Sequence, residues 1–271
     1  MSTLPRPALS EIPRYASSTR RIRTRLPMMT IVERDSGEPA DARQDCTHLS
    51  PGEFRAILFD LDGTLVDTAP DLLLAINLVI GEEGGTPLSQ EEIHPFISHG
   101  SRPMIERGFG IGPEAPGFAG LMERFLAAYR ANIVVHSRLF PGMGTALARI
   151  EARSMVWGIV TNKSRWLTEP LLAGLGLAHR AACVVTRNTT EHPKPHPAPL
   201  LFACDRIGVP PAQCLYIGDA ATDIEAGRRA GARTAVALFG YIPPDERPSD
   251  WGADCRLPSP RALADWLANN P

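Results

Sequence analysis

Short apolar runs recur along this chain, and helical segments separate them. The first run, Ala56-Ile57-Leu58-Phe59, is continuous, as expected for a strand buried on both faces of a parallel sheet. Four similar runs follow at residues 155–161, 183–186, 214–217 and 234–238. Strands that alternate with helices indicate βαβ units, so we expect an α/β fold: a parallel sheet with right-handed crossovers and helices on both faces.

A long stretch without a strand signal separates the first two runs. It covers roughly ninety residues, which is too long for a simple crossover. Residues 71–82 predict a helix with Pro70 in its first turn, and Ser89-Gln90-Glu91-Glu92 fits a capping box. Apolar residues at helical spacing between Phe118 and Tyr129 predict another helix. We therefore expect a small helical domain at residues 69–137, inserted into an α/β core formed by residues 53–68 and 138–271.

Residues 1–52 are rich in Pro, Ser, Thr and Arg and show no periodicity, which predicts a disordered extension. Residues 1–25 contain six arginines and only one acid, Glu11, so a transit peptide is the alternative interpretation. A secretory signal is excluded because no apolar segment follows the arginines. Met28 or Met29 would also fit as the true start of the protein.

Charge and cysteine usage narrow the class of protein. A net charge of -2 argues against a nucleic-acid binder. The longest apolar stretch, residues 72–80, is interrupted by Asn77 and is far shorter than the roughly 20 residues of a membrane span. The five cysteines form no C-x-x-C pair, which predicts free thiols in a reducing cytosol and hence a cytoplasmic protein. The oligomeric state is not predicted.

Two acids directly follow the first apolar run, in Phe59-Asp60-Leu61-Asp62-Gly63-Thr64. Ligands of open parallel sheets bind beyond the carboxyl ends of the strands. At the two-residue period of a strand, Asp60 and Asp62 point roughly the same way. Like charges this close need a cation or a shared proton. Turn or capping acids would explain a single aspartate, but not this pair directly after an apolar strand.

A second acid pair, Asp219 and Asp223, follows the run at residues 214–217. Asp223 on its own would fit a helix cap equally well. With the first pair, however, it would give four carboxylates in one crevice. A small set of hard oxygen ligands suits Mg²⁺, which keeps several waters and shares the phosphate oxygens of a substrate.

Donor groups accompany these acids. Thr161-Asn162-Lys163 closes the second strand with a hydroxyl and backbone N–H groups, and Lys194 lies in a loop that three prolines restrict. We expect Thr161, Asn162 and Lys194 to bind phosphate. Arg102, at the start of a cap helix, is either a solvated residue or, if it faces the site, a specificity residue whose guanidinium pairs with a substrate carboxylate.

In order and spacing, these motifs resemble the four motifs of the haloacid dehalogenase superfamily. Asp60 and Asp62 match the first motif, Thr161 the second, Lys194 the third, and Asp219 with Asp223 the fourth. The resemblance extends from about residue 54 to the C-terminus. It implies a Rossmann-like core, a type 1 helical cap that opens and closes, and a Mg²⁺-dependent phosphatase that acts on a small-molecule phosphate ester.

The resemblance also implies a role for each residue. Asp60 would attack phosphorus and become an aspartyl-phosphate, while Asp62 would act as general acid and then general base. Mg²⁺ would be held by Asp60, the Asp62 carbonyl and Asp219. Asp223 would orient Lys194 or a metal-bound water.

Within the superfamily the chain resembles phosphoglycolate phosphatases and, more closely, bacterial N-acetylmuramic acid 6-phosphate phosphatases. Residues 136–143, 157–163, 240–242 and 251–254 carry this resemblance, while His196 departs from the usual K-P-D-P. It implies hydrolysis of N-acetylmuramic acid 6-phosphate in cell-wall amino-sugar recycling. The alternatives are 2-phosphoglycolate hydrolysis and a phosphomutase, which the motifs do not separate. Asp62 argues against a dehalogenase, which lacks this acid, and the intact motifs argue against a non-catalytic relic.

Overall fold

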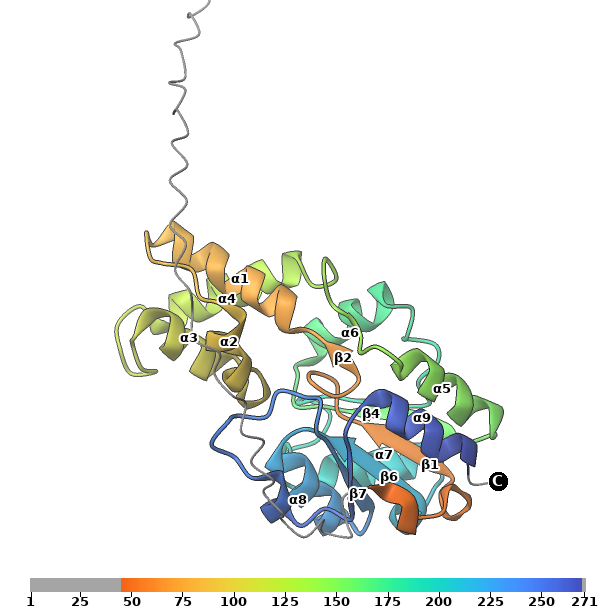
Figure 1. Ribbon diagram of the computed structural model, residues 1–271. Coiled ribbons are helices and arrows are strands. Elements are labelled where there is room, and N and C mark those ends of the chain that lie inside the picture. Colours follow the sequence, from red (N-terminus) through yellow and green to blue (C-terminus); the bar gives the residue numbers. More distant parts are fainter. Residues whose placement is uncertain (1–44, 270–271) are drawn as a thin grey trace, which may run out of the picture. The chain divides into compact units, whose positions relative to one another are not determined.

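The computed structural model describes residues 45–269, and at its centre lies a six-stranded parallel sheet (Figure 1). The strands lie in the order β5-β4-β1-β6-β7-β8, with β1 paired to β4 and β6. The five predicted runs form five of these strands, so the α/β prediction is confirmed. The bounds are β1 Ala56–Phe59, β4 Val156–Val160, β5 Val184–Val185, β6 Cys214–Gly218, β7 Arg233–Ala237 and β8 Cys255–Leu257.

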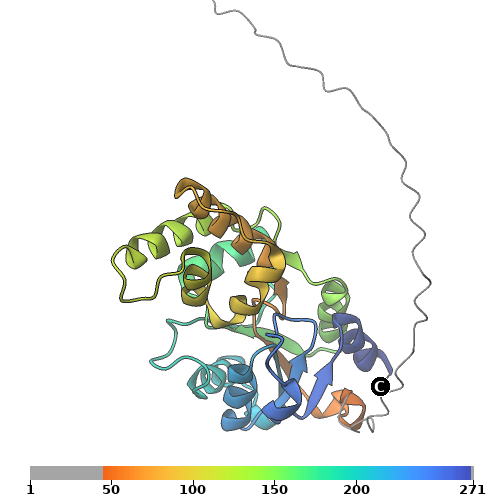
Figure 2. The ribbon, with the colours of Figure 1, turned by 60° about the vertical axis from the view of Figure 1, so that its left-hand side comes forward.

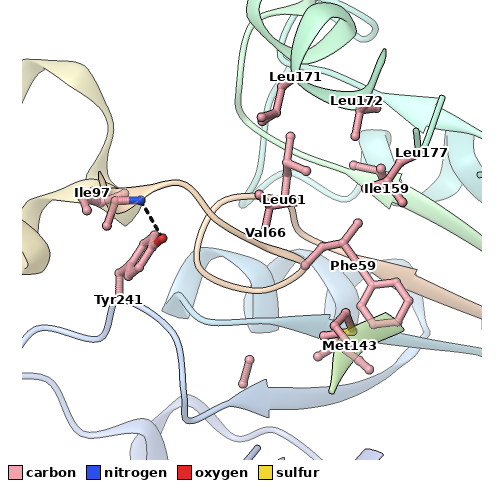
Figure 3. Close-up of a cluster of buried hydrophobic side chains, with 14 of the residues drawn as sticks. Phe59, Leu61, Val66, Ile97, Met143, Ile159, Leu171, Leu172, Leu177 and Tyr241 are labelled. Atoms are coloured by element: carbon pink, nitrogen blue, oxygen red, sulfur yellow. Dashed lines mark hydrogen bonds between the residues drawn. The ribbon is translucent and has the colours of Figure 1, made fainter. Parts of the chain in front are cut away.

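Helices cover both faces of the sheet (Figure 2). Along β1, Ile57 and Phe59 join one buried cluster, and Ala56 and Leu58 join the other, because successive side chains of a strand point to opposite faces. Helices α5, α6 and α9 contribute to the first cluster, where Figure 3 shows Phe59 beside Met143 of α5. Helices α7 and α8 contribute to the second. The bounds are α5 Met143–Ala152, α6 Arg165–Gly174, α7 Ala198–Ile207, α8 Ala221–Ala230 and α9 Pro260–Asn269.

Helices α1 to α4, which precede α5 in the chain, form a helical insert in which α1 packs against α4 (Figure 1). The predicted capping box is present at the start of α2: the Ser89 hydroxyl accepts from the Glu92 N–H, and the Glu92 carboxylate accepts from the Ser89 N–H. The bounds are α1 Ala69–Glu82, α2 Gln90–Ile93, a 3₁₀ helix His94–His99, α3 Ser101–Phe109 and α4 Phe118–Ala131.

A short antiparallel pair, β2 Val66–Asp67 and β3 Arg138–Leu139, connects the insert to the sheet. The buried Asp71, near the start of α1, bonds to the segment by which the chain returns from the insert to the core. Its carboxylate accepts from the backbone N–H groups of His136 at 2.8 Å and Ser137 at 2.9 Å. A carboxylate paired in this way fixes where the insert leaves the core and where it returns.

The start of the folded chain differs from the prediction. Residues 1–44, most of the predicted extension, lie outside the described residues. Residues Cys46–His48 and Pro51–Glu53, however, form two short 3₁₀ helices against the core. The Leu49 carbonyl accepts from Trp266 Nε1 of α9 at 2.9 Å. The packed part of the chain therefore begins before residue 54.

The expectation of five free thiols is also wrong. Cys46 is joined to Cys255 of β8 by a disulfide across 209 residues of sequence. The sequence did not reveal the pair, because β8 carries no apolar run that predicts a strand next to the N-terminal segment. Within the described chain, Cys183, Cys204 and Cys214 are free. No helix between residues 45 and 269 is long and apolar enough to cross a membrane.

Candidate active site

The chain turns sharply where β1 ends. The N–H groups of Leu65 and Val66 both donate to the carbonyl of Leu61, which folds the loop back over the strand end. Gly63 in this loop has φ +82°, and a Cβ at this position would lie 2.2 Å from a carboxylate oxygen of Asp219. Only glycine permits both the backbone conformation and this close approach. The first and fourth motifs therefore meet because Gly63 has no side chain.

Lys194 lies at the centre of the acids. Its Nζ donates to Asp60 Oδ1 at 2.8 Å, Asp223 Oδ1 at 2.6 Å, the Tyr216 hydroxyl at 2.8 Å and the Val160 carbonyl at 3.0 Å. Its side chain is only 2% exposed. Burial acts to lower the pKa of Lys194, but Asp223 and Asp60 outweigh it and raise that pKa above its usual value. The ammonium is therefore charged.

Three carboxylates lie close together here, and two of them, Asp60 and Asp223, contact the Lys194 ammonium. Oxygens of Asp60, Asp219 and Asp223 all lie within 4.8 Å of one another. Burial raises the pKa of Asp60 to about 6, against the opposing charge of Lys194. Burial, followed by the charges of Asp60 and Asp223, raises the pKa of Asp219 to about 7. One lysine does not balance three acids, and their hard oxygens fit a further cation such as Mg²⁺.

Asp219 is oriented from both the core and the insert. Its Oδ1 accepts from the Thr64 hydroxyl at 2.8 Å, and its Oδ2 accepts from the Ser98 hydroxyl at 2.8 Å and the Tyr241 N–H at 2.9 Å. Ser98 belongs to the 3₁₀ helix of the insert. The insert thus contacts the acidic cluster through a direct hydrogen bond.

Asp62 has different partners. Its Oδ1 accepts from the Thr68 hydroxyl at 2.6 Å, and Lys163 Nζ lies 2.9 Å from Oδ1 and 3.2 Å from Oδ2. The same Nζ lies 4.5 Å from the ring centroid of Tyr129 in α4. Burial acts to lower the pKa of Lys163, but Asp62 and Tyr129 outweigh it and raise that pKa. A second charged lysine therefore lies between the core and the insert.

Sequence reasoning gave Lys163 no role, although one signal points to it. The chain has 28 lysines and arginines in total, and only two of them, Lys163 and Lys194, are lysines. The structure brings both lysines to this one site. Arginine and lysine are not interchangeable, because lysine offers a compact point charge on a flexible stem.

The second-motif residues are also placed at the site. The Asn162 amide forms a reciprocal pair with the backbone of Lys194, donating to its carbonyl at 3.0 Å and accepting from its N–H at 3.1 Å. Asn162 thus holds the Lys194 loop. The Thr161 hydroxyl accepts from the Lys163 N–H at 3.1 Å.

A cavity of about 380 Å³ lies where the core meets the insert. The core contributes Asp60, Asp62, Thr161, Asn162 and Lys163, among others. The insert contributes apolar side chains, namely Leu72, Ile97, Met104, Leu126 and Tyr129, and a polar stretch at residues 98–101. The acids and donors of the core therefore face an insert wall that is apolar except at residues 98–101.

Arg102 does not line this cavity. It is exposed, and it lines a separate apolar groove beside Phe118 and Met122. From the same loop, His99 and Ser101 line the cavity instead. Of the two interpretations of Arg102, its exposed position in this groove fits a solvated residue rather than one that faces the cavity.

Tyr241 is a further residue that the motifs did not reveal. Its hydroxyl accepts from the N–H groups of Thr68 at 2.7 Å and Ala69 at 2.9 Å, and donates to Asp67 Oδ1 at 2.6 Å. Its ring contacts the His94 ring edge-to-face, with centroids 4.7 Å apart. Figure 3 shows it pointing from the core loop toward the segment where the insert begins. Tyr241 thus joins the loop after β7 to the start of α1.

The sequence and the fold both identify the family. A family model described as haloacid dehalogenase-like hydrolase matches residues 57–237. The chain belongs to this family.

Relatives with curated names narrow the class further. The chain is 43% identical over 210 residues to an N-acetylmuramic acid 6-phosphate phosphatase of Pseudomonas putida, covering 78% of this chain and 94% of the relative. It is 42% identical over 209 residues to a phosphoglycolate phosphatase of Xanthomonas campestris pv. campestris, covering 77% and 94%.

The crystal structure of a predicted phosphoglycolate phosphatase from Haemophilus somnus matches with a TM-score of 0.71 at 27% identity, covering 81% of this chain and 99% of that one. This chain is accordingly a phosphoric monoester hydrolase, that is, a phosphatase.

Proposed function

We propose that this phosphatase hydrolyses N-acetylmuramic acid 6-phosphate and that Asp60 is its nucleophile. The placement of Asp60 in the cavity wall, with Lys194 Nζ 2.8 Å from Oδ1, supports the second part. Lys194 holds one carboxylate oxygen, so the other can attack phosphorus in line and form an aspartyl-phosphate. The buried charge of Lys194 offsets the repulsion between a carboxylate and a phosphate dianion.

Asp62 is proposed as the general acid and base. It lines the same cavity two residues after Asp60, and Thr68 holds its Oδ1. From there it would protonate the leaving oxygen and then take a proton from the water that hydrolyses the aspartyl-phosphate. Thr161 would orient the phosphoryl oxygens, and Asp223 and Asn162 would position Lys194.

Mg²⁺ belongs to the same proposal. Asp60, Asp219 and the carbonyl of Asp62 would hold it, while Asp223 remains paired with Lys194 at 2.6 Å. When bound, Mg²⁺ would supply most of the charge neutralisation that the phosphoryl group needs.

A chelator test addresses the metal directly. EDTA should abolish turnover, and added Mg²⁺ should restore it. Ca²⁺ should restore little, because its larger and looser coordination misplaces an in-line geometry. Mg²⁺ should also raise the melting temperature of the EDTA-treated enzyme, since a ligand that binds only the folded state stabilises it. Full turnover in metal-free buffer would contradict the assigned ligands.

The choice of substrate rests on the cavity and on the relatives. A volume of about 380 Å³ falls in the range of sites that enclose drug-sized ligands, which suits an amino-sugar phosphate better than a two-carbon acid. The apolar wall of the insert suits the faces of a sugar ring and its N-acetyl group. The Pseudomonas putida relative bears the name of this activity, which points to a role in cell-wall amino-sugar recycling.

The second candidate substrate is 2-phosphoglycolate, because the Xanthomonas campestris relative of nearly equal identity bears that name. Measurement of kcat/KM for both phosphates decides between them. We expect the value for N-acetylmuramic acid 6-phosphate to be the higher one. A clear preference for 2-phosphoglycolate would exclude the amino-sugar assignment, and recovery of an isomerised sugar phosphate instead of inorganic phosphate would indicate a phosphomutase.

A cytoplasmic location is a separate part of the proposal. The three free thiols suit a reducing compartment, whereas a disulfide between Cys46 and Cys255 suits an oxidising one. Titration of accessible thiols in the denatured enzyme, purified without reductant, separates the two. Five thiols would support the reducing cytosol, and three would argue against it.

A further inference from the structure

We propose that Lys163 recognises a carboxylate on the leaving group of the substrate. The inference rests on the proposed function and deepens it, because it names the residue that selects the substrate. N-acetylmuramic acid carries such a carboxylate on its lactyl arm, as does glycolate. Lys163 therefore takes the role that the sequence pattern would give to Arg102.

The position of Lys163 places its ammonium on the leaving-group side of the cavity. Nζ lies 2.9 Å from Asp62, the proposed general acid, whose task requires it to face the leaving oxygen. Lys194 lies instead at Asp60, on the side of the phosphoryl group. A group bonded to the leaving oxygen would extend from Asp62 into the part of the cavity that Lys163 and Tyr129 line.

Lys163 has both the charge and a donor to offer. An ammonium group carries three N–H donors, and Asp62 accepts at most two of them. The ring of Tyr129, whose centroid is 4.5 Å away, contacts the cation through its face, and the Tyr129 hydroxyl, although near enough to Lys163 to interact with its charge, accepts no hydrogen bond of normal length and angle. One donor therefore remains for a ligand. Lys194 in the same site shows that one ammonium can serve two carboxylates, since it contacts both Asp60 and Asp223.

Burial makes this charge selective. The Lys163 side chain is 8% exposed, so its attraction to an anion is screened far less than that of a surface cation. Arg187 also lines the cavity but is exposed, and Arg102 lines the neighbouring groove. In a chain whose other basic residues are all arginine, the two lysines occur only at this site.

The test uses two substrates that differ only in the carboxylate-bearing group. N-acetylmuramic acid 6-phosphate carries the lactyl arm, and N-acetylglucosamine 6-phosphate does not. The measured quantity is the ratio of kcat/KM for the first to kcat/KM for the second. We expect the wild-type ratio to exceed one and Lys163→Met to lower it roughly tenfold to a hundredfold, the range for a lost hydrogen bond between charged groups.

Two further variants control this result. Lys163→Arg keeps the positive charge and should retain a ratio above one, a value that can be judged against the wild type even if the methionine variant folds poorly. Arg102→Met removes a cation that lies outside the cavity and should leave the ratio unchanged. Melting temperatures and turnover of an aryl phosphate identify any variant that is merely unfolded.

The outcomes distinguish failure of the Lys163 inference from failure of the proposed amino-sugar substrate. An equal fall in kcat/KM for both sugar phosphates in Lys163→Met would mean that Lys163 acts only through Asp62, and would overturn the inference. A ratio that falls in Arg102→Met but not in Lys163→Met would overturn it as well. If the wild type prefers 2-phosphoglycolate, the amino-sugar assignment fails instead, and the same variants are then compared on 2-phosphoglycolate and 2-hydroxyethyl phosphate, which lacks the carboxylate.

Discussion

The site has two sides, and each is organised around one lysine. On the phosphoryl side, Lys194 contacts four acceptors, all from the α/β core. On the other side, Lys163 lies between Asp62 of the core and Tyr129 of the insert. The groups proposed to handle phosphate are thus held by the core, whereas those proposed to meet the leaving group lie where the core and the insert join. This difference lets substrate selection vary while the chemistry stays the same.

Removal of the proposed nucleophile should give the largest effect. Asp60→Asn keeps the shape but not the attacking charge, so turnover should fall by about three decades or more on every substrate. Because the pKa of Asp60 is raised to about 6 by burial, its charged form is disfavoured in the folded state and costs stability at pH 7. The melting temperature should therefore not fall. Near-normal turnover by Asp60→Asn would contradict the covalent mechanism.

The two lysines should differ in their effect on stability. Lys194→Met leaves Asp223, whose side chain is 1% exposed, without its cation, and this should cost about 3–5 kcal/mol of unfolding free energy. Lys163→Met should cost less, because its partner Asp62 is 17% exposed and keeps the Thr68 hydroxyl. Urea unfolding of both variants in EDTA measures the difference. Equal losses of unfolding free energy in the two variants would contradict the distinction between an enclosed Lys194 and a more accessible Lys163.

The sequence predicted the residues of the Lys194 side of the site better than those that the insert and a late loop bring to it, and the reason is physical. Asp60, Asp219 and Lys194 follow directly from strand ends and a proline-rich loop, because a parallel sheet brings such positions to one edge. Ser98, Tyr129 and Tyr241 reach the site through the packing of the insert and a late loop, which no local pattern specifies. The two interpretations of Arg102 stayed open for the same reason: a helix start says nothing about which side of the helix faces the core.

The N-terminal boundary offers a similar test within the core. Two truncations differ only in residues 45–52: one removes residues 1–44 and the other residues 1–52. The longer deletion loses the Cys46–Cys255 disulfide and the buried Leu49, so it should be less stable by about 3 kcal/mol, or roughly 5–15 °C in melting temperature without reductant.

Cys46→Ser in the shorter truncation then separates the disulfide from the packing of Leu49 against α9. Equal melting temperatures for the two truncations would mean that residues 45–52 contribute nothing to the core. Turnover should be similar in all three proteins, since these residues lie away from the cavity-lining set.

The smallest predicted effect concerns the joint between the two regions. Tyr241→Phe keeps the ring against His94 but removes the acceptor of the Thr68 and Ala69 N–H groups and the donor to Asp67. Buried backbone donors left without partners should cost about 2 kcal/mol. Because the backbone of residue 241 still donates to Asp219, we expect kcat to fall only a few-fold, with KM rising as the start of α1 loosens.

Tyr129→Phe is the matched control. Among the described residues, the Tyr129 hydroxyl is a buried side-chain atom without a hydrogen-bond partner, while its ring lies against Lys163. Removal of that hydroxyl should change the free energy of unfolding little, because it forms no hydrogen bond of normal geometry and interacts with Lys163 only at longer range. Chemical denaturation of both variants compares two buried tyrosines, one on each side of the joint. If Tyr129→Phe proved the more destabilising, Tyr241 would not be the residue that fastens the insert to the core.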